Sequence, residues 1–416
     1  MTLSRRVFVK SGGLALFSVG LDPLFLARAA FASGAPGEPG DGPILVCLFQ
    51  RGAVDGLSMV VPHGERAYYD ARPRIAVPAN EVVDLDGHFG LHPRLAALAP
   101  WWKRGNLAIV HAAGSPDPTR SHFDAQDYME SGTPGVKATA DGWLNRYCQH
   151  DREHEATAFH AVAFGPQLPR ILAGAAPALA IHNLQAFGLG KAAPVRDRLT
   201  RAFERLYAGQ TTGVVAASSE EAFAAVHQLQ QANPTQYDPA PGVQYPRGPF
   251  GHALLEIAQL IKSRVGVRIA FADVTGWDTH VNQGASEGQL ALRLADFGQA
   301  LDAFATDLGE RMRDIVILTM SEFGRTVAEN GTAGTDHGRA TAMLVLGGPV
   351  AGGKVLGRWP GLDPAQRFEG RDVSVTTDFR DLFAEVLARH LGARDLAAIF
   401  PGFAADAARF PGVIRT

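Results

Sequence analysis

Short apolar runs alternate with amphipathic helical patterns along most of this chain. Polar or glycine-containing segments bound each run, which is typical of strands buried on both faces of a parallel sheet. The runs are residues 43–49, 106–112, 267–273, 315–320 and 341–346, with a weaker strand pattern at 160–164. Strand, helix and strand in succession predict an α/β fold with a doubly wound, largely parallel sheet.

Helical periodicity is clearest over residues 290–308, where leucine and phenylalanine recur on one face. Further helices are expected at 95–103, 121–131, 199–208, 219–231, 250–263 and 378–390. Residues from about 165 to 265 are mostly helical in pattern and are expected to form an insertion or cap. Because proline and glycine are frequent between 233 and 250, we expect a loop there.

The N-terminus has the features of an export signal. Residues 4–10 read SRRVFVK, an apolar stretch follows, and Ala30-Phe31-Ala32 offers a cleavage site. Asp22, Pro23 and Arg28 interrupt the stretch, which makes it a poor membrane span. We therefore expect a twin-arginine signal peptide at 1–32, a flexible lead-in at 33–42 and a single domain at 43–416. The alternative is an amphipathic helix with a chance arginine pair.

Export by the twin-arginine translocase would place the mature chain in the periplasm or outside the cell, without a stable membrane span. The formal net charge of −3 indicates neither nucleic-acid binding nor a polybasic membrane patch. Cys47 lies in an apolar run and is expected to be a buried hydrophobe, whereas its pairing with Cys148 stays open.

Acids and imidazoles cluster just beyond the expected strands. Asp55, Asp278, His280 and Glu322 follow strands, Asp336 and His337 lie in a glycine-flanked loop, and Ser121-His122 adds a hydroxyl and an imidazole. In a parallel sheet such positions converge on one rim, where carboxylates and imidazoles suit a divalent metal. Most have a structural alternative: Asp55 could close a turn, Ser121 could cap a helix, Asp278 and His280 could make loop hydrogen bonds, and Glu322 could pair with Arg325. Asp336 and His337, between glycines, are the hardest to explain in that way.

Arginines lie in the same loops, where a guanidinium can bind an anion or pair with a local acid. They are Arg51, Arg120, Arg325 and Arg339. Other histidines show no clean ligand spacing, and we expect them to be loop or packing residues. These are His88, His92, His150, His154 and His160.

Several motifs together resemble the bacterial domain-of-unknown-function family 1501. They are LFQRGAVDGL (48–57), RSHFDAQ (120–126), GWDTH (276–280), SEFGR (321–325), GTDHG (334–338) and TTDFR (376–380). That family looks distantly similar to the alkaline phosphatase, sulfatase and phosphoglycerate mutase superfamily. The resemblance implies an alkaline-phosphatase-like fold, usually two divalent metals, and a Ser or Thr nucleophile.

By this resemblance Ser121 would be the nucleophile, with His122 and Arg325 as further catalytic residues. The metal ligands would be Asp55, Asp278, His280, Glu322 and His337, with Asp273 a rival acid. The superfamily usually has histidine after the acid matched by Glu322, but this chain has Phe323. One metal, a differently built pair, or no catalysis would each fit that departure.

The predicted function is hydrolysis of an anionic phosphate or sulfate ester, dependent on zinc, calcium or manganese. The alternative is a non-catalytic binding or assembly protein on a degenerate scaffold of the same kind.

The export hypothesis predicts that Arg5→Lys with Arg6→Lys leaves uncleaved precursor in the cytoplasm of a bacterial host. The control, Arg28→Lys, makes the same change within the apolar stretch and should be exported normally. Fractionation followed by immunoblotting measures both. Normal cleavage and export of the double variant would contradict the hypothesis.

Overall fold

The computed structural model describes residues 42–151, 157, 159–184 and 232–416. The expected signal peptide and all but the last residue of the lead-in lie outside these ranges, as do the helices expected at 199–208 and 219–231. The chain divides into two compact units. The main unit comprises Pro43–Thr139, Ala240–Leu254 and Ala272–Thr416, and the second unit comprises Met1–Gly42, Ala140–Pro239 and Leu255–Phe271.

The sheet of the main unit is built from the apolar runs of the sequence. Its strands run in the order β11-β5-β10-β9-β1, followed by the part of β8 that lies in this unit. Their bounds are β1 Ile44–Arg51, β5 Leu107–Gly114, β8 Ile269–Thr275, β9 Ile315–Met320, β10 Thr341–Gly347 and β11 Lys354–Leu356. β1 pairs with β9 in parallel, in a register that joins Ile44 to Ile315. The short strand β12 (Thr377–Asp378) also pairs with β5 in parallel.

The sheet is largely parallel, and β10 is the exception. It runs antiparallel to both β9 and β5. Its sequence is as apolar as that of the parallel strands, and all its residues are buried. Apolar content reports burial on both faces and not strand direction, so the pattern could not distinguish β10 from its neighbours.

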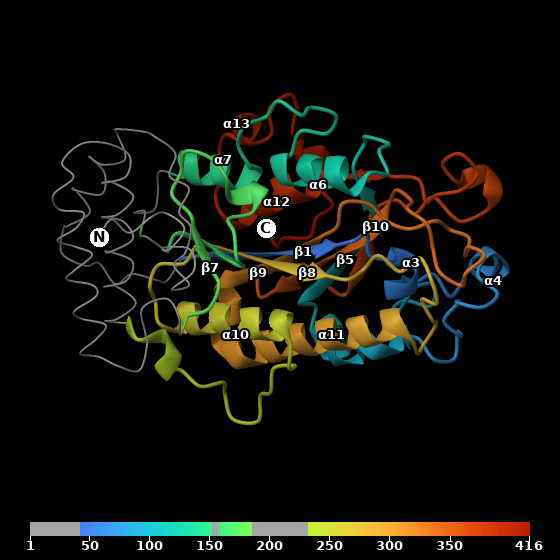
Figure 1. Cartoon of the computed structure of the whole chain (residues 1–416), viewed down its shortest axis with the longest axis horizontal. Helices are drawn as coiled ribbons and strands as arrows, with labels where there is room; N and C mark the ends of the chain where they lie inside the picture. Colours follow the sequence, from blue (N-terminus) through green and yellow to red (C-terminus); the bar gives the residue numbers. More distant parts are fainter. Residues whose placement is uncertain (1–41, 152–156, 158, 185–231) are drawn as a thin grey trace, which may run out of the picture. The chain divides into compact units, whose positions relative to one another are not determined.

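Helices cover both faces of this sheet (Figure 1). α6 (His122–Ser131) and α12 (Phe379–His390) lie on one face, and α11 (Gln289–Leu308) lies on the other. α11 buries Leu294, Phe297, Leu301, Phe304 and Leu308, as its periodicity predicted, whereas Leu292, expected on or near the same face, is exposed.

Smaller elements complete the main unit. A three-stranded sheet has the order β2-β4-β3. The remaining bounds are β2 Val60–Val61, β3 Val83–Asp84, β4 Gly90–Leu91, α3 Gly56–Met59, α4 Arg66–Ala71, η1 Pro93–Leu98, α5 Ala99–Lys103, η4 Gly309–Asp314, η5 Pro364–Gln366, α13 Leu396–Ile399 and η6 Ala407–Arg409.

The second unit contains the parallel pair β6 (Ala161–Phe164) and β7 (Leu179–Ile181), and it holds the first residues of β8. Its helical segments are α7 (Trp143–His150), η2 (Arg170–Leu172), η3 (Pro234–Gln236) and most of α10 (Pro249–Lys262). The sequence did not predict β7 or α7.

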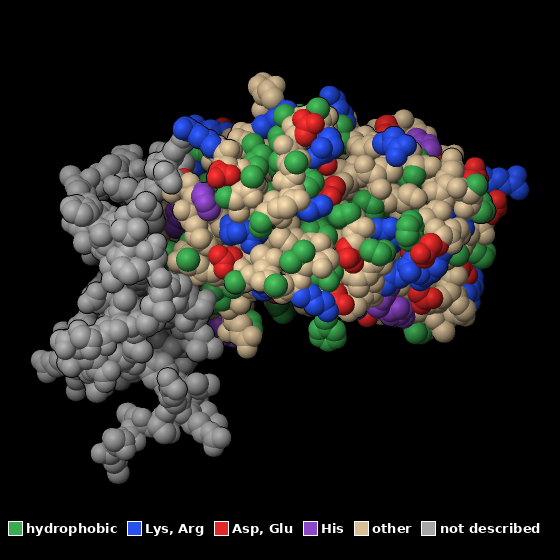
Figure 2. All heavy atoms as spheres, turned by 90° about the horizontal axis from the view of Figure 1, so that it is seen from above, with side chains coloured by type: hydrophobic (Ala, Val, Ile, Leu, Met, Phe, Trp, Pro, Cys, Tyr) green, Lys and Arg blue, Asp and Glu red, His purple; other side chains and the backbone are tan. Residues whose placement is uncertain are grey.

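Both cysteines are free, so they do not pair; Cys47 is fully buried in β1. No helix among the described residues combines the length and apolarity needed to span a bilayer. Basic and acidic side chains are interspersed over the described part of the face in Figure 2. This mixing agrees with the small net charge.

Two leucines on α11 test the packing of the main unit, because Leu294 is fully buried whereas Leu292 is 67% exposed. We expect Leu294→Ala to lower the free energy of unfolding by about 2–5 kcal/mol, since it leaves a cavity. The identical change at Leu292 should cost no more than about 0.5 kcal/mol. Denaturant titration measures both; equal losses would contradict the packing described here.

Candidate metal centre

The centre forms where three segments of the main unit meet. His122 is the first residue of α6, Asp278 and His280 lie in the loop after β8, and His337 lies in the loop before β10. Glycines allow the loops to pack closely. A Cβ on Gly334 would meet the carbonyl oxygen of His280 at 2.2 Å, and one on Gly338 would meet the backbone of Arg325 at 2.4 Å.

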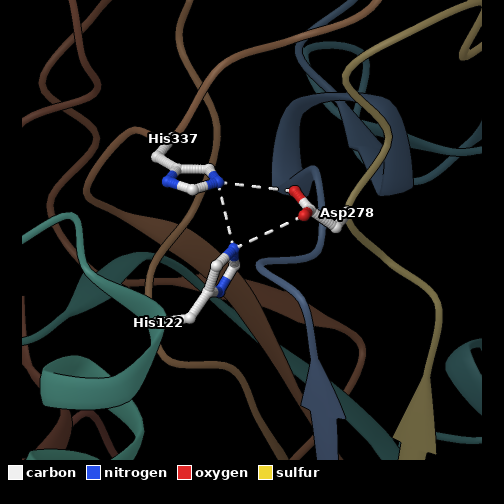
Figure 3. Close-up of side chains that lie close together, drawn as sticks. All are labelled: His122, Asp278 and His337. Atoms are coloured by element: carbon white, nitrogen blue, oxygen red, sulfur yellow. Dashed lines mark hydrogen bonds and ion pairs between the residues drawn. The ribbon is translucent and has the colours of Figure 1, made fainter.

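Three side chains converge in this centre: His122, Asp278 and His337 (Figure 3). Each offers a ligand atom within 4.8 Å of the other two. The Nε2 atoms of His122 and His337 are 3.0 Å apart, and the Asp278 carboxylate lies 3.7 Å and 3.4 Å from them. His280 adjoins the group, with its Nε2 2.9 Å from that of His337 and 3.0 Å from Asp278 Oδ1.

Hydrogen bonds at Nδ1 determine the tautomer of each imidazole. His122 Nδ1 lies 2.9 Å from Glu322 Oε1, and His280 Nδ1 lies 3.1 Å from Asp336 Oδ1. His337 Nδ1 lies 2.9 Å from the carbonyl oxygen of Arg120. Carboxylates and carbonyls only accept hydrogen bonds, so each Nδ1 carries a proton, and the neutral form of each ring would present a lone pair at Nε2.

These lone pairs point at one another, which is unfavourable unless a proton or a cation lies between them. Ligand atoms around tetrahedral zinc, with bonds of about 2.0–2.1 Å to nitrogen, are separated by about 3.3 Å. The separations of 3.0, 3.4 and 3.7 Å between the converging atoms lie on either side of that value. The side chains present are thus compatible with a divalent metal, and carboxylates on Nδ1 are typical partners of metal-binding histidines.

Arg325 controls the charge of Asp278. Burial opposes ionisation of this carboxyl, but the hydrogen bond and charge of Arg325 outweigh it and lower the pKa. Arg325 Nη2 lies 2.6 Å from Asp278 Oδ1, and the guanidinium also donates to the carbonyl oxygens of Ala53 and Thr335. Because its side chain is inaccessible, Arg325 holds these loops together and is not free to bind an anion. The described contacts of Arg325 are structural, and the catalytic role expected of it stays a prediction.

Glu322 binds the Nδ1 side of His122 and is not one of the three converging residues. Its carboxylate accepts from His122, from Gln126 Nε2 at 2.8 Å and from the backbone N–H of Gly52 at 2.8 Å. Burial would raise its pKa, but these hydrogen bonds, that of His122 first, lower it. The same hydrogen bond raises the pKa of His122, whereas burial lowers that of His337.

Asp55 lies outside the centre, contrary to its expected role as a metal ligand. It is fully buried, and Arg72 donates to both its oxygens at 2.6 and 3.0 Å. Ser58 and Gln283 also donate to it, so no oxygen faces the histidines unpaired. Burial would raise the pKa of Asp55, but the charge and hydrogen bonds of Arg72 lower it. Asp55 also stands at the N-cap position of α3, which begins at Gly56, but its side chain makes no cap hydrogen bond there.

Ser121 is the N-cap residue of α6, and its hydroxyl accepts from the backbone N–H of Asp124 at 3.5 Å. The cap that the sequence offered as its alternative role is therefore present. Ser121 also stands between two contributors to the centre: the carbonyl of Arg120, which binds His337, and the ring of His122.

The remaining loop arginines are engaged with protein groups. Arg51 binds Glu130 and Asp273, and Arg120 binds Glu369 and Asp372. Arg339 donates to backbone carbonyls and lies over the ring of Phe368. Asp273, the rival acid, is thus paired with Arg51.

The sequence did not predict three residues that bind the buried acids near the centre. Gln126 binds Glu322, and Gln283 and Arg72 bind Asp55. Gln126 and Gln283 do have a sequence signal, because each follows a histidine of the centre by a few residues, within a helix turn or a tight loop. Arg72 has no such signal in the sequence, because it lies outside all the motifs identified above.

Metal binding can be tested with two aspartates that each contact one histidine ring, Asp336 at Nδ1 and Asp84 at Nε2. Asp336 binds His280 at 3.1 Å in the centre, and Asp84 binds His63 at 3.0 Å elsewhere. We expect Asp336→Asn to weaken zinc binding about 10–100-fold and His337→Ala to weaken it further. Asp84→Asn, the control, should leave zinc affinity unchanged in a chelator competition assay. Equal affinities for all variants would contradict a metal at this centre.

Comparison with known proteins identifies the family of the chain. No curated protein matches its sequence. Among solved structures, the chain is similar to the lipoteichoic acid synthase LtaP from Listeria monocytogenes, with 9% identity, a TM-score of 0.31, and coverage of 77% of this chain and 71% of that chain. That likeness is too loose to carry an argument. The family model for "Protein of unknown function (DUF1501)" matches residues 43–403, which confirms the resemblance seen in the motifs. The chain belongs to the DUF1501 family.

Proposed function

We propose that this protein is an exported, metal-dependent hydrolase of phosphate or sulfate esters. The observation that carries the proposal is the convergence of His122, Asp278 and His337, with the Nδ1 of both imidazoles already hydrogen-bonded. Such a donor set is preorganised for a divalent ion and leaves room in the coordination sphere. His280 is the natural additional ligand.

A divalent ion bound there would supply Lewis acidity, which neutralises an anionic ester and lowers the pKa of a nearby hydroxyl or water. The protein offers a second source of positive potential. Ser121 caps α6, whose unpaired N–H groups and dipole favour an anion at that end. Because the loop arginines are paired, the metal and this helix end would bind the ester.

Ser121 is the proposed nucleophile. Its hydroxyl would lose its proton as the oxygen attacks phosphorus or sulfur. A new O–P or O–S bond forms, the bond to the leaving alcohol breaks, and the leaving oxygen takes up a proton, so that the alcohol departs neutral. Water would then cleave the serine ester and regenerate the hydroxyl. Glu322 and Asp336 would orient the imidazoles of His122 and His280, and Arg325 would keep Asp278 ionised.

One observation favours the alternative, a non-catalytic metal-dependent binding protein. Asp55 is paired with Arg72, so a ligand implied by the superfamily resemblance is committed elsewhere. Such a binder would retain an aryl phosphate or sulfate in a metal-dependent manner without turning it over.

Two substitutions at Ser121 distinguish a nucleophile from a helix cap. Ser121→Ala removes both roles, whereas Ser121→Asn removes the hydroxyl and keeps a good N-cap residue. We expect both to reduce metal-dependent hydrolysis of aryl phosphates or sulfates to background. Only Ser121→Ala should also lower the free energy of unfolding, by about 1 kcal/mol.

Ser131→Ala, which removes a hydroxyl at the other end of α6, serves as the control and should retain activity. Full activity in Ser121→Asn would exclude Ser121 as nucleophile. Metal-dependent binding without turnover in the wild-type protein would establish the alternative.

A further inference from the structure

Gln283 lies behind the centre, at the meeting point of its two loops, and is completely buried. Its Oε1 accepts hydrogen bonds from Thr279 Oγ1 at 2.7 Å and from Thr335 Oγ1 at 2.8 Å. Thr279 stands between Asp278 and His280, and Thr335 is two residues before His337. One oxygen atom therefore joins the loop after β8 to the loop before β10.

The other end of the same amide binds the buried acid. Gln283 Nε2 donates to Asp55 Oδ2 at 2.7 Å and lies 3.3 Å from Ser58 Oγ. Arg72 in turn binds Asp55 and donates to the carbonyl oxygens of Thr326 and Val327, at 2.8 Å each. The amide is thus tied to the end of β1 and to the segment that follows Arg325.

The chemistry at this position requires glutamine. Asp55 can only accept, so the NH₂ group of Gln283 faces it, and Oε1 faces the two threonine hydroxyls that donate to it. Glutamate would place a second carboxylate against Asp55. An apolar residue of similar size would leave buried hydroxyls and a carboxylate oxygen without this partner, which is costly in a site that excludes water.

We propose that Gln283 is a positioning residue that holds the two ligand-bearing loops in register, and that Asp55 acts through it. This inference rests on the proposed metal-dependent function and assigns a role to the β1 motif that the metal centre itself does not use. The loops supply Asp278, His280 and His337, so loss of their register would separate the ligand atoms while leaving each ligand present.

Gln283→Met tests the proposal, because methionine matches the length of glutamine and lacks its hydrogen bonds. We expect zinc affinity, measured by chelator competition, to fall about 10–100-fold, as is typical for partners that orient metal ligands. Hydrogen exchange in the metal-free protein should accelerate in both loops, at 276–283 and 334–338. Thr335→Val removes only one of the hydrogen bonds, so it provides a milder variant if Gln283→Met folds poorly.

A buried amide in the second unit supplies the matched control. Asn145 binds the carbonyl oxygens of Leu172 and Ala176 and accepts from the N–H of Ala176. Asn145→Leu should lower stability without changing zinc affinity or exchange in the two loops. Any loss of affinity in Gln283→Met beyond that of the control is then due to positioning and not to lower stability.

Coupling between the threonines provides a second readout. Both hydroxyls donate to one oxygen, so Thr279→Val and Thr335→Val should each weaken zinc binding, and neither should weaken it further in the Gln283→Met background. Fully multiplicative effects would overturn the proposal, as would wild-type zinc affinity with unchanged loop exchange in Gln283→Met. If the wild-type protein bound neither zinc, calcium nor manganese, the proposed function would fail, whereas loop exchange would still decide the role of Gln283.

Discussion

The buried ion pair between Asp55 and Arg72 is the interaction on which the site region depends. Both side chains are inaccessible to water, and transferring such charges into the interior costs several kcal/mol unless every donor and acceptor is paired. Here that condition is met, because Arg72 also donates to two backbone carbonyls, and Ser58 and Gln283 donate to Asp55. The pair therefore constrains the geometry around it: any movement that broke one contact would leave a charge without a partner.

The loops that carry the histidines of the centre are held in place by similar buried contacts. Arg325 provides a second buried guanidinium, joining the carbonyls of Ala53 and Thr335 to the carboxylate of Asp278. Two fully desolvated cations thus fix loops that regular secondary structure does not stabilise. A metal-binding group needs this rigidity, because three Nε2 lone pairs and a carboxylate repel one another in the absence of a cation and would otherwise separate.

Much of this arrangement could be predicted from the sequence, because it depends on local patterns. β9 occupies the residues expected for it, and α6 and α12 each begin one residue after the expected start, with Ser121 and Asp378 as their N-caps. Asp278 follows β8 and lies at the rim expected for it, whereas His337 precedes β10 and reaches the same rim because β10 runs antiparallel. These predictions succeeded because burial and capping leave a periodic or adjacent signature in the chain.

The roles within the site could not be predicted in the same way. Asp55 looks like a ligand by position, yet Arg72, seventeen residues later in a segment without a recognisable motif, takes both its oxygens. Glu322 and His122 are 200 residues apart, and only the fold shows that one orients the other. A carboxylate after a strand can bind a metal, orient a histidine or bind a guanidinium, and the partner that decides among these is distant in sequence.

Phe323 shows how the departure from the superfamily pattern bears on the number of metals. Its ring is buried and packs against the rings of His122 and His337, with centroids 4.9 and 5.1 Å away. A phenyl ring cannot bind a metal, but here it supports two imidazoles that can. Among the described residues, one group of side chains has metal-binding geometry, and His122, from α6, belongs to it. Asp55, bound to Arg72, and Phe323, packed on the two rings, therefore support the surroundings of this group, and the function that we propose needs a single metal there.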